Sequence, residues 1–336
     1  MPIRYILGIE TSCDETAAAV LTRDGKILSN IVLSQDEIHA PYGGIVPELA
    51  SRKHIVSIGY IVEESLRRAG KNLTDMDAFA VTQGPGLIGS LLVGISFAKS
   101  LAYYMKKPLF PVDHLEAHVH SVFLENREVP FPALALLVSG GHTTLMVLNK
   151  KLDYRILGKT RDDAAGEALD KISKFLDLGY PGGPVIERLA RKGDPESFAF
   201  GQPKMSDGSL NYSFSGFKTA ALRHIKKHKL NSEHSQLNDF LASFEQAVIT
   251  SLLNNIERAL FDIKARSLIL SGGVARNSRL RRQFKDLADR WGIESFLPSP
   301  DFCTDNAAMI AGLALEKIRR GETGRLDLRL NAYARS

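Results

Sequence analysis

Cysteine is scarce in this chain. Among 336 residues only two cysteines occur, Cys13 and Cys303, and they lie far apart with no Cys-x-x-Cys pair. A disulfide framework and a structural zinc module of thiolates both need closely spaced cysteines, so both are excluded. Such a composition is typical of a reducing compartment, and we expect a cytoplasmic protein.

Long apolar segments are also few. The N-terminal residues have too short an apolar stretch, and an acid too early, for a secretory signal. The longest uncharged stretch, residues 78–98, is long enough to raise the question of a membrane span, but it contains Gln83, Pro85 and four glycines. It is better interpreted as a buried strand, a glycine turn and a buried helix, so we expect no membrane association.

The common motifs of nucleotide enzymes and metalloproteases are missing as well. No segment matches the GxxxxGK[ST] pattern of P-loop enzymes or the GxGxxG pattern of dinucleotide-binding domains. In an HExxH protease the glutamate directly follows the first histidine, whereas the segment HLEAH at 114–118 has its glutamate one position later. All three classes of enzyme are therefore disfavoured.

What the chain does contain is the composition of an ordinary globular protein, with 44% hydrophobic and 24% charged residues. At roughly 150 residues per domain, its length suggests two domains. Its 43 Lys and Arg residues exceed its 38 Asp and Glu residues, which gives a net charge of +5. This mild positive charge suits a polyanionic partner without establishing one.

Predicted strands and helices alternate, and the same order of elements occurs twice. Each half contains antiparallel strands around a polar tip, then helices, then a strand that ends in a glycine turn. The expected strands lie at 5–10, 16–21, 26–33, 78–81, 109–112, 133–138, 145–149, 154–159 and 267–270, and the expected helices include 54–69, 114–124, 163–177, 184–192 and 235–261. We interpret this pattern as a duplicated α/β domain with a cleft between the copies.

The expected boundary between the two halves lies near Pro108. The first lobe would comprise residues 1–108, completed by a C-terminal helix within about 306–336, and the second lobe residues 109–305. The irregular, polar segment 193–215 is interpreted as a surface insertion in the second half.

Two glycine turns stand at the ends of predicted strands, at residues 139–143 (SGGHT) and 271–274 (SGGV). Glycines there leave backbone N–H groups open to an anion, especially where a helix starts next. One such turn would be ordinary turn chemistry. Two of them, together with the glycines at 180–184 and 84–86, favour a nucleotide or phosphate site.

Two histidines, His114 and His118, stand four residues apart, which places them on one face of a helix. That spacing allows both imidazoles to reach one divalent ion. The alternative is a pair of surface histidines. A metal would need a third ligand, and Asp305 is the best candidate because it lies in a short polar loop before an apolar helix.

Charged groups have two interpretations each. Glu10, Asp14 and Glu15 lie at a tip between strands, where they either form a solvated turn or perform acid–base or cation chemistry. The acids within 162–170 either favour a helix dipole or serve the site. The basic runs 223–229 and 276–285 are either solvated helix faces or contacts for phosphates.

The segment 88–105 has more apolar surface than one helix face needs, and we expect it to pack against a partner protein as well as its own core. Burial on both sides by the chain itself is the alternative. The residues concerned are Leu91, Leu92, Ile95, Leu101 and Ala102.

Taken together and in order, these motifs resemble those of the TsaD family, formerly called Gcp or YgjD. The resemblance covers essentially the whole chain. Its motifs are GIETSCDET, GGIVPELASR, QGPGLIGSL, HLEAH, LVSGGHT, DDAAGEALDK, YPGGP, YSFSGFKT, SGGVARN and CTDNAAM. The resemblance implies an α/β, actin-like/Hsp70-like ATPase fold with two duplicated lobes and a central cleft.

The resemblance also implies an activity. Members of this family transfer a threonylcarbamoyl group from threonylcarbamoyl-AMP to N6 of adenosine 37 in tRNAs that read ANN codons, and release AMP. The partners implied are tRNA, a TsaB-like paralogue, a TsaE-like ATPase and a separate synthase that supplies the donor.

Site residues follow from the same resemblance. His114, His118 and Asp305 would hold one divalent metal, with Fe²⁺ the first candidate and Zn²⁺ the second. The reaction itself, rather than the resemblance, makes Asp14 and Glu15 candidates for a base, because an exocyclic amine is a poor nucleophile and its proton must leave. The adenylate, or alternatively ATP or ADP, would bind Leu137, Val138, Ser139, Gly140, Gly141, Asp170, Gly183, Glu187 and Asn277. Both sites would belong to the second lobe.

Three other classes of function compete with this one. A small-molecule kinase of the same fold would need an acid pair for Mg²⁺ but not the two histidines. A nucleotide-dependent scaffold or chaperone would bind nucleotide and partner without turnover. A protease would need a nucleophile–base pair or HExxH, and the sequence supplies neither. Metal analysis best separates the first two from a metal-dependent transferase.

Overall fold

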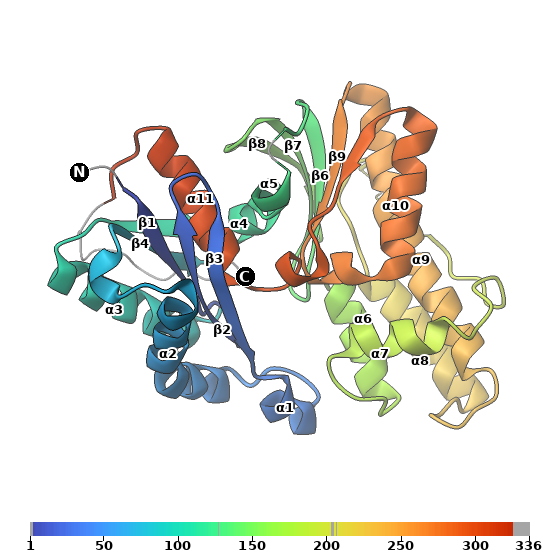
Figure 1. Cartoon of the computed structure of the whole chain (residues 1–336). Coiled ribbons are helices and arrows are strands. Elements are labelled where there is room, and N and C mark those ends of the chain that lie inside the picture. The colour runs from blue at the N-terminus through green and yellow to red at the C-terminus, as the bar shows by residue number, and fades with distance from the viewer. Residues whose placement is uncertain (1–2, 127, 203–204, 206, 325–336) are drawn as a thin grey trace. The chain divides into compact units, whose positions relative to one another are not determined.

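The computed structural model describes residues 3–126, 128–202, 205 and 207–324. The chain forms two compact units, drawn in Figure 1. Unit 1 consists of residues 1–127 and 304–336, and unit 2 consists of residues 128–303.

Unit 1 is built on a five-stranded sheet with the order β3-β2-β1-β4-β5. β1 pairs antiparallel with β2 and parallel with β4, so that Ile9 lies opposite Ala18 on one side and Val81 on the other. Residues 17–21 of β2 are all buried, as expected for a strand covered on both faces. The strands are β1 (Tyr5–Glu10), β2 (Glu15–Thr22), β3 (Ile27–Ser34), β4 (Ala78–Gly84) and β5 (Leu109–Asp113).

Helices cover the two faces of this sheet. Leu7 and Ile9 pack into the apolar core that α2 and α3 share, and Gly8, which points the opposite way, faces α11. A Cβ at Gly8 would lie 2.5 Å from the Ala307 carbonyl oxygen, so glycine allows α11 to approach the sheet closely. The helices are α1 (Asp36–His39), α2 (Pro47–Ala69), α3 (Ile88–Met105), α4 (His114–His120), α5 (Val122–Glu125) and α11 (Ala307–Arg319), with 3₁₀ turns at Ala40–Tyr42 and Leu73–Asp75.

Unit 2 repeats the architecture around the sheet β10-β9-β6-β7-β8. Its strands are β6 (Ala133–Val138), β7 (Thr143–Lys150), β8 (Asp153–Lys159), β9 (Ser267–Ser271) and β10 (Glu294–Phe296). Its helices are α6 (Ala165–Phe175), α7 (Gly182–Ala190), α8 (Ser215–His228), α9 (Leu237–Asp262) and α10 (Ser278–Trp291), with 3₁₀ turns at Gly273–Arg276 and Pro300–Phe302.

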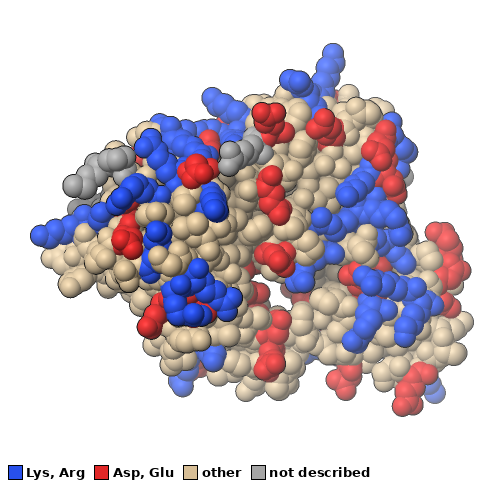
Figure 2. Space-filling view, viewed as in Figure 1, with Lys and Arg blue, Asp and Glu red and all other residues tan. Residues whose placement is uncertain are grey.

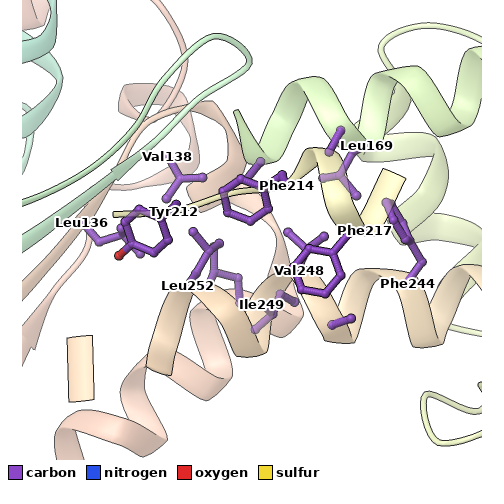
Figure 3. Close-up of a cluster of buried hydrophobic side chains, with 14 of the residues drawn as sticks. Leu136, Val138, Leu169, Tyr212, Phe214, Phe217, Phe244, Val248, Ile249 and Leu252 are labelled. Carbon is purple, nitrogen blue, oxygen red and sulfur yellow. The ribbon is translucent and has the colours of Figure 1, made fainter. Parts of the chain in front are cut away.

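The core of unit 2 is rich in aromatic side chains. Figure 3 shows Phe214 and Phe217 between Val138 of β6, Leu169 of α6 and the apolar side of α9. Most of the predicted insertion 193–215 lies outside helices and strands, but Tyr212 and Phe214 at its end are fully buried. That end is therefore part of the core rather than a surface segment.

The two sheets have the same strand order and the same pairing directions, because the second sheet, read from its other edge, is β8-β7-β6-β9-β10. In each, the first strand pairs antiparallel with the second and parallel with the fourth, and the fourth pairs parallel with the fifth. This repetition confirms the duplicated α/β plan that the order of predicted elements indicates.

The division between the two units differs from the expected boundary near Pro108. β5 pairs in parallel with β4, with Leu109 opposite Phe79, so it is the last strand of the first sheet and not the start of the second copy. α4 follows β5 directly, which places its histidines in unit 1 rather than in the second lobe. The helix after residue 306 belongs to unit 1 as expected, and residues 325–336 lie outside the described part of the chain.

α3 is the helix, among the residues described, that is long and apolar enough to cross a membrane by length and composition. Its inner side packs against β4 and α2, and Leu91, Ile95 and Ala102 are buried there. Such burial is typical of a core helix. Its outer side leaves Leu92 49% and Tyr104 79% exposed.

Candidate functional site

The three residues considered as metal ligands lie together in unit 1. His118 Nε2 lies 2.9 Å from Asp305 Oδ1, and His114 Nε2 lies 3.6 Å from the same oxygen. One potential ligand atom from each residue falls within 4.8 Å of the others. Local structure fixes this arrangement, because Asp113 caps the start of α4 and Asn306 caps the start of α11.

The donor set fits a divalent transition metal. Two imidazoles and one carboxylate suit Fe²⁺ or Zn²⁺ better than Mg²⁺, which prefers oxygen ligands. His114 and His118 are buried, and the Asp305 side chain is 16% exposed. Three protein ligands leave coordination positions open to a substrate.

The charges around this cluster favour a cation. Burial disfavours the charged form of His114, but the carboxylates of Asp305 and Glu10 outweigh burial and raise the pKa of His114 to about 9. A positive charge is therefore stabilised at this position, and a divalent ion would supply one.

Asp14 and Glu15 lie within electrostatic reach of the same cluster. Burial raises the pKa of both carboxyl groups, and the negative charge of Asp305 adds to the rise. A carboxylate whose pKa is raised is better suited to accept a proton near neutral pH. The structure thus brings both candidate bases into the neighbourhood of the histidine–aspartate cluster.

The turn that carries these acids is held by α2 and α3. His54 of α2 donates from Nε2 to the Cys13 carbonyl oxygen at 3.0 Å, and its Nδ1 lies 2.8 Å from Thr16 Oγ1. At the start of α3, a Cβ on Gly86 would lie 2.4 Å from the Ser12 carbonyl oxygen. Gly86 therefore serves close packing within unit 1.

Those two glycine turns lie side by side. β6 and β9 are parallel neighbours with Leu137 opposite Ser271, so both strands end at the same edge of the sheet. Gly272 has a φ of +93°, and a Cβ there would lie 2.4 Å from the Val138 carbonyl oxygen, so only glycine fits. A Cβ on Gly140 or Gly141 would meet no described atom within 4 Å, so this backbone borders open space.

The first turns of α6 and α7 complete this edge. A Cβ on Gly166 would lie 2.7 Å from the Ser139 carbonyl oxygen, which shows how closely α6 starts against the first glycine turn. Asp170 Oδ1 accepts a hydrogen bond from Gly182 N at 2.8 Å and thereby fixes the start of α7. The nearest neighbour of a Cβ on Gly183 would be 4.0 Å away.

Glu187 and Asn277 join α7 to the start of α10. Glu187 Oε1 accepts hydrogen bonds from the hydroxyl of Ser278 at 2.6 Å and from its N–H at 3.0 Å. Burial raises the pKa of Glu187, but Ser278 and Arg191 outweigh burial and lower it overall. The Asn277 side chain caps α10 and donates to Glu245 Oε1 at 2.5 Å. The expected adenylate residues are thus linked along one edge of unit 2, where Leu137 and Val138 are buried strand residues.

Comparison with known proteins identifies the family. A family model described as TsaD, tRNA N6-adenosine threonylcarbamoyltransferase, matches residues 26–312. The chain belongs to the TsaD family. Relatives of that name include one from Geotalea uraniireducens, 52% identical over 91% of this chain and 89% of the relative, and one from Caldicellulosiruptor bescii, 45% identical over 94% of each. As a member of this family, the chain is a transferase that modifies adenosine in tRNA.

Solved structures identify the fold of this TsaD chain. HypF of T. kodakarensis superposes with a TM-score of 0.62 at 15% identity, over 94% of this chain and 48% of HypF. Component A of the (R)-2-hydroxyglutaryl-CoA dehydratase of Acidaminococcus fermentans superposes with a TM-score of 0.55 at 15% identity, over 94% of this chain and 99% of component A. Both have the actin-like ATPase fold, which confirms the fold class that the sequence motifs imply.

The paired acids of the TsaD motif DDAAGEALDK are structural. Asp163 forms ion pairs with Lys171 and Lys218, each at 2.6 Å. Asp162 Oδ1 accepts hydrogen bonds from the N–H groups of Phe214 and Ser215 and so fixes the start of α8. Asp162 and Asp163 thus each have partners within unit 2, which are ion pairs for Asp163 and backbone hydrogen bonds for Asp162.

Sequence reasoning missed two polar residues of this TsaD site. His54 lies on the mostly apolar inner side of α2, and Glu245 lies in the middle of the mostly buried helix α9. Burial raises the pKa of Glu245, although Asn277 and Arg279 oppose the rise. The available signal was an ionisable residue at an apolar position of a helix, but the sequence does not say which partner it meets.

Proposed function

We propose that this chain transfers the threonylcarbamoyl group from threonylcarbamoyl-AMP to N6 of adenosine 37 in tRNAs that read ANN codons. The N6 nitrogen attacks the carbamoyl carbon, the bond from that carbon to the phosphate oxygen breaks, and AMP leaves. One N6 proton is lost to a base. The observation that carries the proposal, beyond family membership, is the His114–His118–Asp305 cluster near the buried Asp14 and the half-buried Glu15, whose carboxyl pKa values are both raised.

We assign the metal to this cluster, with Fe²⁺ the first candidate and Zn²⁺ the second. A divalent ion bound there would supply a Lewis acid for the carbamoyl oxygen. Asp14 or Glu15 would accept the N6 proton, because their raised pKa brings them closer to neutrality.

We assign the AMP part of the donor, or ATP or ADP, to the edge of unit 2 lined by Gly140, Gly141 and Gly183. The Ser139 N–H already donates to the His142 carbonyl oxygen at 2.8 Å within the turn. The donors for a phosphate or a developing negative charge are therefore the N–H groups of Gly140 and Gly141.

The test is an assay of modified adenosine in tRNA. Wild-type chain, donor, a TsaB-like paralogue and a TsaE-like ATPase are incubated with an ANN-reading tRNA transcript, and nucleosides are measured by mass spectrometry. We expect threonylcarbamoyladenosine and stoichiometric AMP, and no product from a transcript with guanosine at position 37. AMP release without modified tRNA would contradict the proposal. A separate synthase would supply the donor, and the setting would be the cytoplasm.

We propose that tRNA binds the basic surface of unit 2. In Figure 2, Lys and Arg side chains gather over the region of α8 and α10. Not all of the basic run 276–285 is free for phosphate, because Arg281 donates to the carbonyl oxygens of Ala275 and Pro298, each at 3.1 Å. Arg282 and Lys285 are exposed.

Replacement of both Arg282 and Lys285 by alanine is expected to weaken tRNA binding evenly across ANN-reading tRNAs. Phosphate contacts carry little sequence information, and each one lost lowers the salt slope by about one unit. Filter-binding titrations at several salt concentrations measure both quantities. Arg290→Ala, near the other end of α10, is the matched control. An unchanged salt slope in the double variant would place tRNA on another surface.

We also propose that the outer side of α3 contacts the TsaB-like paralogue. Leu91, Ile95 and Ala102, which we expected at this surface, are buried in unit 1, whereas Leu92 is 49% exposed. A charge at Ile95 would thus unfold the chain and test nothing about a partner.

Leu92→Asp is expected to weaken complex formation by tenfold or more, or about 1.4 kcal/mol, while changing the stability of the isolated chain by about 0.5 kcal/mol or less. Analytical ultracentrifugation and thermal unfolding measure the two effects. Ile156→Asp, at an apolar position of β8 that is 47% exposed, is the control for a surface charge. Equal association by both variants would contradict the assignment.

A further inference from the structure

One fully buried carboxylate beside the metal cluster has no role in the mechanism above. Glu10, at the end of β1, is 0% exposed. Its Oε1 accepts a hydrogen bond from Ser12 N at 2.5 Å, and its Oε2 accepts one from Thr82 Oγ1 at 2.6 Å. The same Oε2 lies 3.1 Å from Nδ1 of His114.

We infer that Glu10 is a positioning residue: it fixes the tautomer and the ring orientation of His114, so that Nε2 faces the metal position beside Asp305. The inference rests on the metal site proposed above. Glu10 contacts Nδ1 of His114, whereas Asp305 lies near Nε2, the other ring nitrogen. Glu10 is not itself one of the three clustered residues.

The chemistry of the contact decides the tautomer. A carboxylate only accepts hydrogen bonds, so the proton between Glu10 and His114 belongs to Nδ1. In the neutral imidazole that a metal requires, the lone pair is then on Nε2, the nitrogen that lies 3.6 Å from Asp305 Oδ1. Ser12 Oγ also lies 3.2 Å from Nδ1, but a charged acceptor forms the stronger bond in a buried site. Metal-binding histidines commonly depend on such a partner at their other nitrogen.

The sheet holds Glu10 in place. β1, β4 and β5 are consecutive parallel strands, and their C-terminal ends carry Glu10, Thr82 and Asp113, which His114 follows. Both oxygens of Glu10 are occupied by donors from this edge, so the carboxylate has a single orientation. By contrast, Nδ1 of His118 has no hydrogen-bond partner among the described residues. Of the two histidines, a carboxylate at Nδ1 therefore positions only His114 among the described residues.

The test compares Glu10→Gln with wild type in two measurements. A glutamine has the same shape but only one acceptor oxygen, so it cannot accept from Ser12, Thr82 and His114 together. We expect Zn²⁺ affinity, measured by competition with a chromophoric chelator, to fall on the order of 10- to 100-fold. In ¹⁵N-histidine spectra of the Zn²⁺-loaded protein, the protected Nδ1–H signal of His114 should be lost or should exchange faster.

A control separates positioning from general destabilisation. Asp163→Asn removes the charge of a buried carboxylate in unit 2 that pairs with Lys171 and Lys218, so it should lower thermal stability and leave Zn²⁺ affinity unchanged. If Glu10→Gln does not fold, Glu10→Asp keeps the charge but withdraws it from Nδ1, and weaker Zn²⁺ binding is again expected.

The outcomes are distinguishable. Unchanged affinity together with an unchanged Nδ1–H signal in the Glu10 variant, while His114→Ala loses Zn²⁺, overturns the role of Glu10 and leaves the metal site standing. Zn²⁺ binding that is the same in wild type and His114→Ala overturns the metal site and the inference with it.

Discussion

Replacement of His114 or His118 by alanine is expected to abolish stoichiometric metal and to lower the rate of adenosine modification on the order of 10³-fold. The physical reason is that each variant leaves two ligands where three now lie within 4.8 Å, and a divalent ion supplies several kcal/mol of charge stabilisation to the reaction. Elemental analysis of the purified variants measures the metal, and mass spectrometry of tRNA nucleosides measures the activity.

His120→Ala is the matched control for these variants. His120 lies on the same helix α4 and is buried, but it does not belong to the ligand cluster. The His120→Ala variant is expected to keep its metal even if its thermal stability falls. Metal content that is equal in His114→Ala and His120→Ala would mean that the ion binds elsewhere in the chain.

Replacement of Gly140 by valine is expected to weaken binding of AMP or of a non-hydrolysable donor analogue by at least tenfold, or about 1.4 kcal/mol. Gly140 does not have a positive φ, and a Cβ there meets no described atom within 4 Å, so the fold can accept the side chain. The valine would occupy the space in which the phosphate should lie against the backbone N–H groups. Isothermal titration calorimetry measures the loss.

Gly201→Val tests whether any added side chain in unit 2 has this effect. Gly201 is exposed, and a Cβ there also meets no described atom within 4 Å. We expect normal ligand binding and normal thermal unfolding from this variant. If the Gly140 variant also binds normally, the adenylate lies away from this turn.

The amino-acid sequence determined the local features and, through repetition, the general plan. Helical spacing placed His114 and His118 on one face, the helix expected over 54–69 ends where α2 ends, and the repeated order of strands and helices indicated a duplicated α/β domain, which the two matching sheets confirm. These features depend on neighbouring residues and on hydrophobic periodicity, which can be read along the chain.

Which strand pairs with which was decided only by the tertiary structure. The segment 109–113 could equally begin a second sheet or close the first, and its pairing with β4 assigned it and the following histidines to unit 1. Side-chain partners were decided in the same way. The sequence shows Arg281 in a basic run, but its guanidinium donates hydrogen bonds to backbone carbonyls. It shows Gly86 in a glycine-rich turn, but Gly86 packs closely against Ser12.

The same limit applies to the site itself. The sequence supplied Glu10 as one of three acids at a strand end, without separating it from Asp14 and Glu15. Only the register of β1 and β4 and the start of α4 bring its carboxylate to Thr82 and His114, residues that are 72 and 104 positions away in the chain. Contacts between residues so far apart depend on the packing of whole strands and helices, which no local pattern encodes.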